Sequence, residues 1–409
     1  MKGFGVKRRV SILGSTGSIG TNTLNVIRQH PDLFDVVSLS AGSSLDVLVK
    51  QIMEFKPRFV SVGNDEKAEA LKLQLPEDIQ TVVLAGREGH RFCVENSRPD
   101  VLISAMSGSH GLEASLQAII QGVSILGIAN KEILVMAGDF IWDALNESKT
   151  TLVPVDSEHS AIFQALMGNK ISQVKCLILT GSGGPFRKRD RATFDSITKE
   201  EALRHPNWVM GQKITVDSAT MMNKGLEFIE ALRLFRVHRD QVKVVIHPES
   251  IVHSLVEFWD GSVISQMGLS DMKIPISLAL LYPDRLPLQF DRPFDLTKIG
   301  ALHFEEPDLE KFRCLKLAMN IDFYGRSGPI VLNAANEAAV DGFLKDQIRF
   351  VQIPEIVEAS LEEFRSRHPM NLSEVIDLDE EVKNWVYSQF SASIGSRRTG
   401  AAHEMILKV

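Results

Sequence analysis

Cysteine is scarce in this chain, with only three residues, Cys93, Cys176 and Cys314, among 409. An odd and widely spaced set provides neither a disulfide framework nor the ligand spacing of a zinc site. Sparse, unpaired cysteines are typical of proteins in a reducing cytosol. We therefore expect a cytoplasmic protein.

An excess of positive charge is also lacking, because 45 basic side chains face 52 acidic ones and the net charge is −7. Broad binding to nucleic acid requires a strongly basic surface. No apolar run approaches the length of a membrane span, and the first residues lack the apolar core of a secretory signal. We expect no nucleic-acid partner and no membrane partner, although a local basic pocket for a small anion remains compatible with this composition.

What the chain does contain is an ordinary globular composition, with 44% hydrophobic and 24% charged residues. Residues 1–155 alternate short β-rich runs, such as RRVSIL and FDVVSLSA, with helical stretches. Strands that alternate with helices predict a parallel sheet with right-handed crossovers. The first 155 residues are therefore expected to form a Rossmann-like domain.

The remainder of the chain changes character twice. Residues 156–285 combine probable strands, KCLILTG among them, with helices and dense polar motifs, and predict a second α/β domain. Residues 286–312 are rich in proline, phenylalanine and aspartate without a clear period, which favours a linker. Residues 313–409 are largely helical and alanine-rich and predict a C-terminal helical bundle. The expected class is α/β with these three domains.

A glycine-rich loop follows the first strand. VSILGSTGSIGTNTLNVI places Gly14, Gly17 and Gly20 between a strand and a helix. This context is the one that dinucleotide binding requires, since the N–H groups at the helix start can bind phosphates. The spacing is G-x-x-G-x-x-G rather than G-x-G-x-x-G, so a glycine turn in a nucleotide-free sheet is the alternative.

The end of the second strand indicates which dinucleotide is bound. NAD sites place an acid there to bind the ribose 2′-hydroxyl, but no acid occupies residues 40–44. Gly42, Ser43 and Ser44 could instead donate hydrogen bonds to a 2′-phosphate. The segment favours NADP, although it carries no basic residue.

The stretch VPVDSEH places Asp156 and Glu158 two positions apart after a probable strand. Alternate strand residues point to the same side, and like charges held together repel. A hard divalent cation would make the arrangement tolerable, because Mg²⁺ and Mn²⁺ bind carboxylate oxygens. The alternative is a strand-end turn that caps a helix.

A second polar segment, VDSATMMNKGLE, is expected to open with a capping Asp-Ser and then run as a helix. Asn223, Lys224 and Glu227 fall on one helical face. Asn223 and Lys224 suit a phosphate, and Glu227 suits a metal beside it. A surface helix with solvated charges is an equally simple interpretation of this segment alone.

Three further motifs favour a ligand site. LTGSGGPF offers a glycine turn for an anion, with the Ser182 hydroxyl beside it. HPNWVMGQK places an exposed Trp208 on a loop of the kind that closes over ligands. Lys131 follows a strand, at the edge where parallel sheets bind ligands. The alternative for LTGSGGPF is a plain glycine turn, and the alternative for Trp208 is a side chain that anchors its loop to the protein. In the segment IHPESIVHS, His247 and His253 could be structural histidines.

Together the motifs GSTGSIG, ANKE, PVDSEH, LTGSGGPF, HPNW, VDSATMMNKGLE and NAANE resemble the 1-deoxy-D-xylulose 5-phosphate reductoisomerase family. They occur in that family's order and cover most of residues 8–340. The resemblance implies a homodimeric enzyme of non-mevalonate isoprenoid biosynthesis that uses NADPH and Mg²⁺ or Mn²⁺. It would convert a phosphorylated sugar, 1-deoxy-D-xylulose 5-phosphate, to 2-C-methyl-D-erythritol 4-phosphate by retro-aldol and aldol steps followed by hydride transfer.

The resemblance also implies roles for individual residues. The metal ligands would be Asp156, Glu158 and Glu227, with Lys131 and His205 as further catalytic groups. Substrate would contact Ser157, Ser182, His205, Trp208, Ser218, Asn223, Lys224 and Glu227. The cofactor would contact Thr16, Gly17, Ser18, Ile19, Gly42, Ser43, Ser44, Ala105, Met106, Asn130, Glu132, Met210 and Gly211.

One residue departs from the family pattern, since family members often carry a lysine where this chain has Ser43. The departure weakens the expected contact with a 2′-phosphate, so NADPH remains the expected cofactor and NADH is the alternative. Two rival functions also follow from the residues. A semialdehyde dehydrogenase would need a cysteine nucleophile, and Cys176 lies in an apolar run. A catalytically silent NADP-binding sensor would be expected to lack the metal carboxylates.

Overall fold

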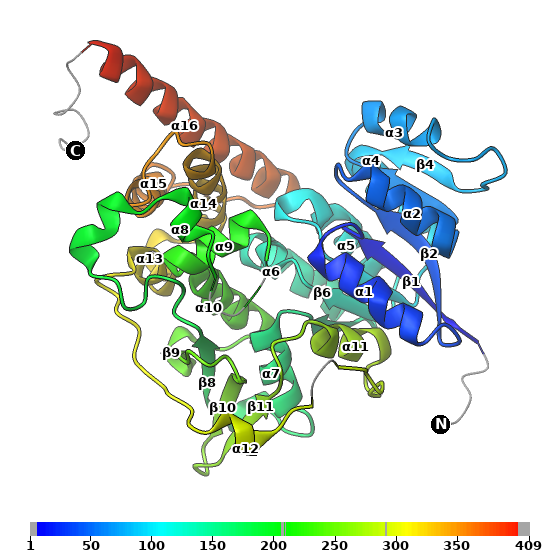
Figure 1. The fold of residues 1–409 in the computed structure, drawn as a ribbon, viewed down its shortest axis with the longest axis horizontal. Helices are drawn as coiled ribbons and strands as arrows, with labels where there is room; N and C mark the ends of the chain where they lie inside the picture. The colour runs from blue at the N-terminus through cyan, green and yellow to red at the C-terminus, as the bar shows by residue number, and fades with distance from the viewer. Residues whose placement is uncertain (1–5, 206–207, 209, 291–292, 400–409) are drawn as a thin grey trace. The chain divides into compact units, whose positions relative to one another are not determined.

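The computed structural model describes residues 6–205, 208, 210–290 and 293–399, with the backbone alone for residues 391–399 (Figure 1). The chain divides into two compact units, each assembled from separate segments. The first unit comprises Met1–Leu134, Gly138–Thr180 and Ile251–Leu302. The second comprises Val135–Ala137, Gly181–Ser250 and His303–Val409.

A seven-stranded parallel sheet dominates the first unit and confirms the expected Rossmann-like architecture. Its strand order is β4-β3-β2-β1-β5-β6-β7, so the order reverses between β1 and β5, which is where such sheets bind ligands. The strands are β1 (Arg8–Leu13), β2 (Phe34–Ser40), β3 (Phe59–Val62), β4 (Val82–Ala85), β5 (Val101–Ser104), β6 (Ile125–Ile128) and β7 (Thr151–Pro154).

The sheet strands are short apolar runs because helices cover them, and all four residues of β5 and of β6 are buried. The core includes Val10, Val60 and Ile103 from the strands and Ile276 from a later helix. The helices of this unit are α1 (Ser18–Gln29), α2 (Leu45–Phe55), α3 (Asp65–Lys72), α4 (Gly86–Ser97), α5 (Leu112–Ile120), α6 (Lys131–Asn146), α7 (Ser157–Ala165), α11 (Lys273–Leu281) and α12 (Leu296–Ile299). Three residues of α6, Val135–Ala137, belong to the second unit.

The first unit also contains antiparallel strands. β10 (Val252–Phe258) pairs with β8 (Val174–Gly181) on one side and with β11 (Val263–Met267) on the other. The first two residues of β11, Val263 and Ile264, are 52% and 41% exposed. The nearby Trp259 is 67% exposed. This corner of the unit therefore presents apolar side chains to solvent.

The second unit is largely helical, as expected from residue 313 onward. Its elements are η3 (Arg191–Ser196), α8 (Lys199–Ala202), α9 (Gln212–Thr220), α10 (Met222–Phe235), β9 (Val242–Ile246), α13 (Arg313–Met319), α14 (Gly328–Leu344), α15 (Gln352–Glu363) and α16 (Leu372–Thr399).

Small residues set the close packing of these helices. A Cβ on Gly225 of α10 would lie 2.6 Å from Ala318 of α13, and a Cβ on Gly342 of α14 would meet the Phe390 ring of α16 at 2.5 Å. No helix within the described residues is both long and apolar enough to cross a bilayer.

Candidate cofactor, metal and substrate sites

The glycine loop between β1 and α1 has the geometry of a phosphate cradle. Gly14 has a φ of 84°, and a Cβ there would lie 2.4 Å from the Ala105 carbonyl oxygen. A Cβ on Gly20 would lie 2.3 Å from the Gly14 carbonyl oxygen. Both positions therefore exclude any side chain. Ala105 and Met106, which follow β5, lie directly beside this loop.

The start of α1 leaves backbone donors for an anion. Gly17 occupies the N-cap position, and no side chain there hydrogen-bonds to the first turn. Helix N-termini leave N–H groups without intrahelical partners and carry a partial positive charge. Ser18 and Ile19 open the helix, so their N–H groups fit the pyrophosphate of a dinucleotide.

The turn after β2 carries the expected hydrogen-bond donors. Gly42, Ser43 and Ser44 are exposed, and Ser44 is the N-cap of α2 without a side-chain capping bond. A residue that the sequence analysis missed lies nearby. The Gly63 N–H donates to the Gly42 carbonyl at 3.3 Å, and the Lys67 Nζ lies 3.6 Å from where a Cβ on Gly63 would stand.

Lys67 escaped detection because it belongs to α3, more than twenty residues beyond the turn. Only the pairing of β2 with β3 brings the two segments together, through the register Ser40–Ser61. Lys67 forms no ion pair with a carboxylate within the described part of the chain. One signal in the sequence could have identified Lys67. It is a lysine at the third position of the helix that follows β3, and β3 is the strand next to β2, whose end carries the Gly42–Ser44 turn.

Asp156 and its neighbours lie at the end of β7. Asp156 is the N-cap of α7, but its side chain makes no capping hydrogen bond. Instead the Lys131 Nζ lies 2.5 Å from Asp156 Oδ2, and both side chains are mostly buried. Lys131 is the first residue of α6, and the preceding Asn130 donates from Nδ2 to the Gly108 carbonyl at 2.8 Å.

The strand-alternation argument for Asp156 and Glu158 is wrong. Ser157 and Glu158 already belong to α7, so the two acids lie at a strand-to-helix turn and not on a strand. Ser157 Oγ donates to Glu158 Oε2 at 2.5 Å. A carboxylate at an N-cap that does not cap its helix keeps its lone pairs for other partners.

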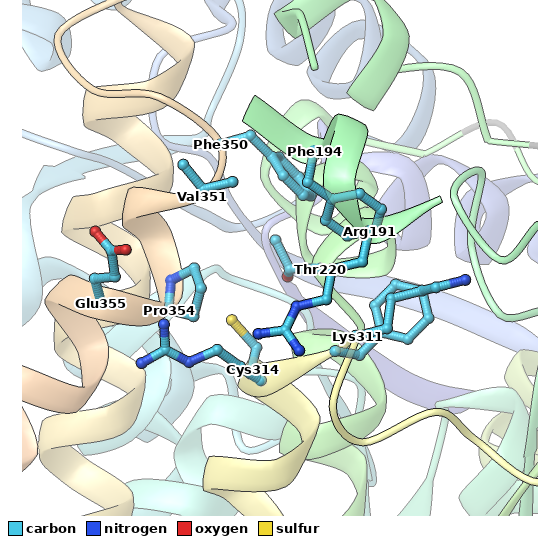
Figure 2. A pocket seen from close by; sticks show the side chains of 11 residues that line it. Arg191, Phe194, Thr220, Lys311, Cys314, Phe350, Val351, Pro354 and Glu355 are labelled. Carbon is cyan, nitrogen blue, oxygen red and sulfur yellow. The ribbon is translucent and has the colours of Figure 1, made fainter. Parts of the chain in front are cut away.

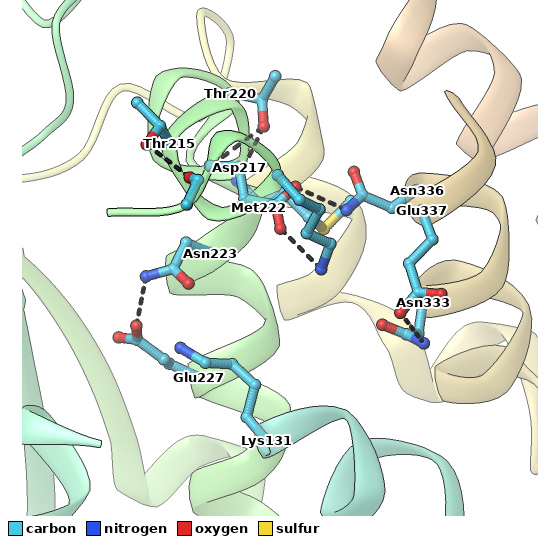
Figure 3. Close-up of polar contacts among 12 residues, drawn as sticks. Lys131, Thr215, Asp217, Thr220, Met222, Asn223, Glu227, Asn333, Asn336 and Glu337 are labelled. Carbon is cyan, nitrogen blue, oxygen red and sulfur yellow. Dashed lines mark hydrogen bonds and ion pairs between the residues drawn. The ribbon is translucent and has the colours of Figure 1, made fainter. Parts of the chain in front are cut away.

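Glu227 in the second unit is held by its own helix. Asn223 Nδ2 donates to Glu227 Oε1 at 2.5 Å (Figure 3). Lys224 forms an ion pair with Glu227 Oε2. The side chains of Lys224 and Glu227 are 5% and 1% exposed. The interpretation of this segment as a solvated surface helix is therefore wrong.

The glycine turn after β8 packs against the same residues. A Cβ on Gly181 would lie 2.7 Å from Lys224 Cε, and one on Gly184 would lie 2.4 Å from the Ser218 carbonyl oxygen. These two contacts bring the turn that carries Ser182 to α9 and α10. The predicted phosphate-binding residues of the second unit are thus neighbours: Ser182, Ser218, Asn223 and Lys224.

The expected capping role of Asp217 is wrong. Asp217 lies inside α9 with 1% of its side chain exposed, and it accepts a hydrogen bond from Asn336 Nδ2 at 2.7 Å (Figure 3). It also pairs with Lys213 at 2.8 Å. The helix breaks after it, at Met221, whose φ is 62°.

His205 is neutral at pH 7 because burial lowers its pKa to about 4. Its Nδ1 accepts a hydrogen bond from the Trp208 N–H at 2.9 Å, so the ring proton lies on Nε2, which is 3.3 Å from Ser182 Oγ. Ser182 Oγ also accepts from the Gly184 N–H at 3.2 Å. The Ser182 hydroxyl hydrogen is therefore left to donate to a ligand.

The Trp208 loop is described only in part, because Pro206, Asn207 and Val209 lie outside the described residues. Trp208 is partly buried, not exposed as expected. Met210 follows, and Gly211 is the N-cap of α9.

Two histidines have structural surroundings. His247 is fully buried and stacks on Phe304 at 4.6 Å between ring centroids, and His253 is 7% exposed. These surroundings favour the structural interpretation of both residues. Cys176 is 3% exposed within β8, which removes the nucleophile that a semialdehyde dehydrogenase would need.

Three family models match the chain. The model described as 1-deoxy-D-xylulose 5-phosphate reductoisomerase matches residues 10–138. The model of that enzyme's C-terminal domain matches residues 152–235, and a further model described as DXP reductoisomerase C-terminal domain matches residues 267–385.

Curated relatives carry the same description. A 1-deoxy-D-xylulose 5-phosphate reductoisomerase from Geobacillus sp. (strain WCH70) is 48% identical over 379 residues, which cover 93% of this chain and 99% of the relative. One from Chloroherpeton thalassium is 46% identical over 386 residues and covers 94% and 99% of the two chains.

Solved structures agree. A DOX-P reductoisomerase in complex with NADPH, fosmidomycin and magnesium has a TM-score of 0.89 and 39% identity, covering 94% of this chain and 98% of that one. The enzyme from Zymomonas mobilis in complex with NADPH has a TM-score of 0.87 and 38% identity, covering 94% and 99%.

Proposed function

The chain belongs to the 1-deoxy-D-xylulose 5-phosphate reductoisomerase family and catalyses the NADPH-dependent conversion of 1-deoxy-D-xylulose 5-phosphate to 2-C-methyl-D-erythritol 4-phosphate; from that premise we propose which residues perform each part of the reaction. The activity makes the protein an oxidoreductase of isoprenoid biosynthesis. NADPH and magnesium are its cofactors.

We propose that Asp156, Glu158 and Glu227 hold the divalent cation. The donor set is three carboxylates, which suits Mg²⁺ or Mn²⁺ and not a softer metal. Asp156 and Glu227 each have an independent feature that favours ligation. Asp156 is the N-cap of α7 without capping that helix through its side chain, and Glu227 is a nearly fully buried carboxylate. When bound, such a cation supplies Lewis-acid catalysis.

The phosphate of the substrate is assigned to Ser182, Ser218, Asn223 and Lys224. A buried ammonium beside amide and hydroxyl donors recognises a phosphate dianion through charge-assisted hydrogen bonds. The single observation that carries this assignment is the packing of the Gly181–Gly184 turn on Lys224 and on the end of α9. In the same turn, Ser182 Oγ accepts from the Gly184 N–H and lies 3.3 Å from His205 Nε2, so its own hydrogen is left to donate to the phosphate.

The reaction is proposed to break the C3–C4 bond of the substrate by a retro-aldol step and to rejoin the fragments as a branched aldehyde. NADPH then donates a hydride to the aldehyde carbon, and a proton completes the alcohol. The phosphate-binding residues hold one end of the substrate, so the fragments stay together between the two steps. Ser157 and Lys131 are assigned to the substrate hydroxyls, with Lys131 positioned by Asp156.

His205 and Trp208 are proposed to close the site. A neutral His205 donates from Nε2 to Ser182 and accepts from the Trp208 backbone, so the two residues fix each other and the phosphate donor. The indole of Trp208 would exclude water from the reacting groups. Met210 and Gly211 are assigned to the nicotinamide end of the cofactor.

The cofactor is assigned to two turns of the first unit. The pyrophosphate would bind Thr16, Gly17, Ser18 and Ile19, and the cleft would be lined by Ala105, Met106, Asn130 and Glu132. The 2′-phosphate would bind Gly42, Ser43 and Ser44. Lys67 would supply the positive charge that Ser43 lacks, since its ammonium lies beside the backbone that pairs with Gly42. This assignment favours NADPH over NADH.

A homodimer in the cytoplasm is proposed as the functional state. The edge strand β11 and the neighbouring Trp259 expose apolar side chains, and a second copy that pairs with this edge would cover them. Free, buried cysteines are compatible with the reducing cytoplasm.

The experiment that tests the proposal is a turnover assay with 1-deoxy-D-xylulose 5-phosphate. Activity is expected with NADPH and Mg²⁺ or Mn²⁺, with a clear loss when NADH replaces NADPH. A metal chelator is expected to abolish turnover and leave NADPH binding intact. Turnover that survives complete chelation would contradict the carboxylate assignment, whereas NADPH binding without any turnover would favour the sensor.

A further inference from the structure

A cavity in the second unit lies outside the residues assigned to the reaction. Its volume is about 200 Å³, and it lies among η3, the end of α9, the start of α13 and the start of α15. Figure 2 shows the side chains that line it. None of the proposed substrate or metal residues is among them: Arg191, Phe194, Thr220, Lys311, Phe312, Arg313, Cys314, Phe350, Val351, Pro354 and Glu355.

The cavity combines positive charge with aromatic walls. Arg191, Lys311 and Arg313 are cationic, and Glu355 is the single acidic residue in the lining. Arg313 is already paired with Glu358. Neither Arg191 nor Lys311 forms an ion pair with a carboxylate within the described ranges of the chain. Lys311 Nζ donates to the Arg187 carbonyl at 3.0 Å. The Lys316 ammonium and, less strongly, the Arg191 guanidinium hold the pKa of Glu310 below its usual value, but Arg191 makes no ion pair with Glu310 in the described ranges. The planar guanidinium of Arg191 therefore keeps donors for an anion.

The walls and floor are apolar and neutral. Phe194, Phe312 and Phe350 contribute rings, with Phe194 and Phe350 packed edge to face at 5.9 Å between centroids. The Arg191 side chain reaches towards Thr220 and Cys314 at the floor (Figure 2). Burial, and after it the nearby Asp217 carboxylate, raise the pKa of Cys314 to about 12, so the Cys314 side chain itself is a neutral thiol.

We propose that this cavity is a binding site for a small phosphate monoester that carries an apolar group. The phosphate would bind the Arg191 guanidinium in a bidentate manner, and the apolar group would lie against the phenylalanine rings. The volume restricts the ligand to a fragment-sized molecule, because drug-sized ligands fill larger pockets. The proposal depends on the proposed function in one respect, namely that the substrate binds elsewhere, at the residues assigned to it above.

The floor of the cavity connects it to the substrate phosphate residues. Thr220 Oγ1 donates to the Asp217 carbonyl and accepts from the Met222 N–H, each at 3.2 Å. Thr220 therefore fastens the junction between α9, which carries Ser218, and α10, which carries Asn223 and Lys224. A ligand that contacts Thr220 would therefore contact the junction of α9 and α10, the two helices that carry the residues assigned to the substrate phosphate.

The test is calorimetric titration of phenyl phosphate into the full-length enzyme saturated with NADPH, magnesium and fosmidomycin, so that the substrate site is already filled. We expect one equivalent to bind. Arg191→Gln is expected to weaken binding about tenfold or more, as for loss of a charge-assisted hydrogen bond. Arg191→Lys should recover part of the loss. The matched control is Lys188→Gln, which removes one exposed positive charge nearby but outside the lining, and should change affinity less than twofold.

Inorganic phosphate in the same titration measures the contribution of the Arg191 contact without that of the phenylalanine rings. We expect it to bind several-fold more weakly than phenyl phosphate. No saturable binding to the filled enzyme would overturn the proposal. Equal affinity in wild type and Arg191→Gln would also overturn it. A separate turnover assay with NADPH and magnesium, run before fosmidomycin is added, tests the proposed function, and its failure would leave the result for this cavity unaffected.

Discussion

The carboxylates of Asp156 and Glu227 are held in contrasting ways. Glu227 is bound by residues three and four positions earlier on its own helix. Asp156 is paired with Lys131, which is 25 positions away and follows a different strand. The contacts of Glu227 follow from the spacing of residues along one helix. The contact of Asp156 with Lys131 exists only because β6 and β7 are neighbours in the sheet. A charged site can thus be set by a helix or by a sheet edge.

The largest expected effect comes from removing the carboxylates themselves. Asp156→Asn and Glu227→Gln should each lower kcat/KM at least about 10³-fold, because loss of a ligand removes several kcal/mol of Lewis-acid stabilisation. NADPH affinity, measured by nucleotide fluorescence, should remain within twofold. If the two acids share one ion, the two losses will be similar and the double variant will be no worse than either. Near-normal turnover in either variant would remove that residue from the metal site.

Lys224, which pairs with Glu227, and Lys131, which pairs with Asp156, are expected to affect different kinetic constants. Lys224→Gln is expected to raise the KM for the substrate about 10- to 100-fold, because it removes a charge-assisted bond to phosphate. Lys131→Gln is expected to lower kcat instead, since it positions Asp156 and a substrate hydroxyl. Steady-state kinetics on both variants measure this division. An unchanged KM in Lys224→Gln would contradict the phosphate assignment.

Trp208→Ala is expected to act on the substrate and not on the nucleotide. Its loss should raise the substrate KM about tenfold, since a closing residue of this size buries a large apolar area. NADPH binding should be unchanged, because the assigned nucleotide contacts lie mostly in the first unit. Equal weakening of both ligands would indicate general damage to the fold.

Lys67→Gln tests the corresponding claim for the first unit. NADPH affinity should fall about tenfold while NADH affinity stays constant, because only the 2′-phosphate would lose a partner. Lys72→Gln is a matched control on the same helix, since Lys72 pairs with Glu69. A parallel loss of NADH affinity in Lys67→Gln would count against a role in cofactor choice.

The smallest effect concerns acid stability. Burial lowers the pKa of His90 to about 4. Between pH 6.5 and pH 4, His90 is therefore protonated in the unfolded chain and neutral in the folded chain. Stability from this group is therefore intact above pH 6.5 and falls as the pH drops towards 4. The free energy of unfolding should be about 2 kcal/mol lower at pH 5 than at pH 7. His90→Gln, compared with wild type by urea unfolding at both pH values, should lose this part of the pH dependence.

The sequence predicted the parallel sheet and the helical C-terminal region because short apolar runs and helical periodicity are local properties. It also grouped Asn223, Lys224 and Glu227 correctly, since one helical face brings them together. Asp217 was assigned wrongly because its partner Asn336 lies 119 positions away. Lys67 was missed for the same reason, since strand pairing and not spacing brings it to the cofactor turn. The roles of individual site residues stay predictions.

The left-handed backbone at Met221 has a consequence for the proposed phosphate site. In an unbroken helix Ser218 and Lys224 would lie about 9 Å apart along the axis and face different directions. The one left-handed residue between them turns the chain, so that residues from both helices converge on the Gly181–Gly184 turn. In the proposed site, binding of the substrate phosphate would therefore depend on the backbone conformation of Met221, where a β-branched side chain would be strained.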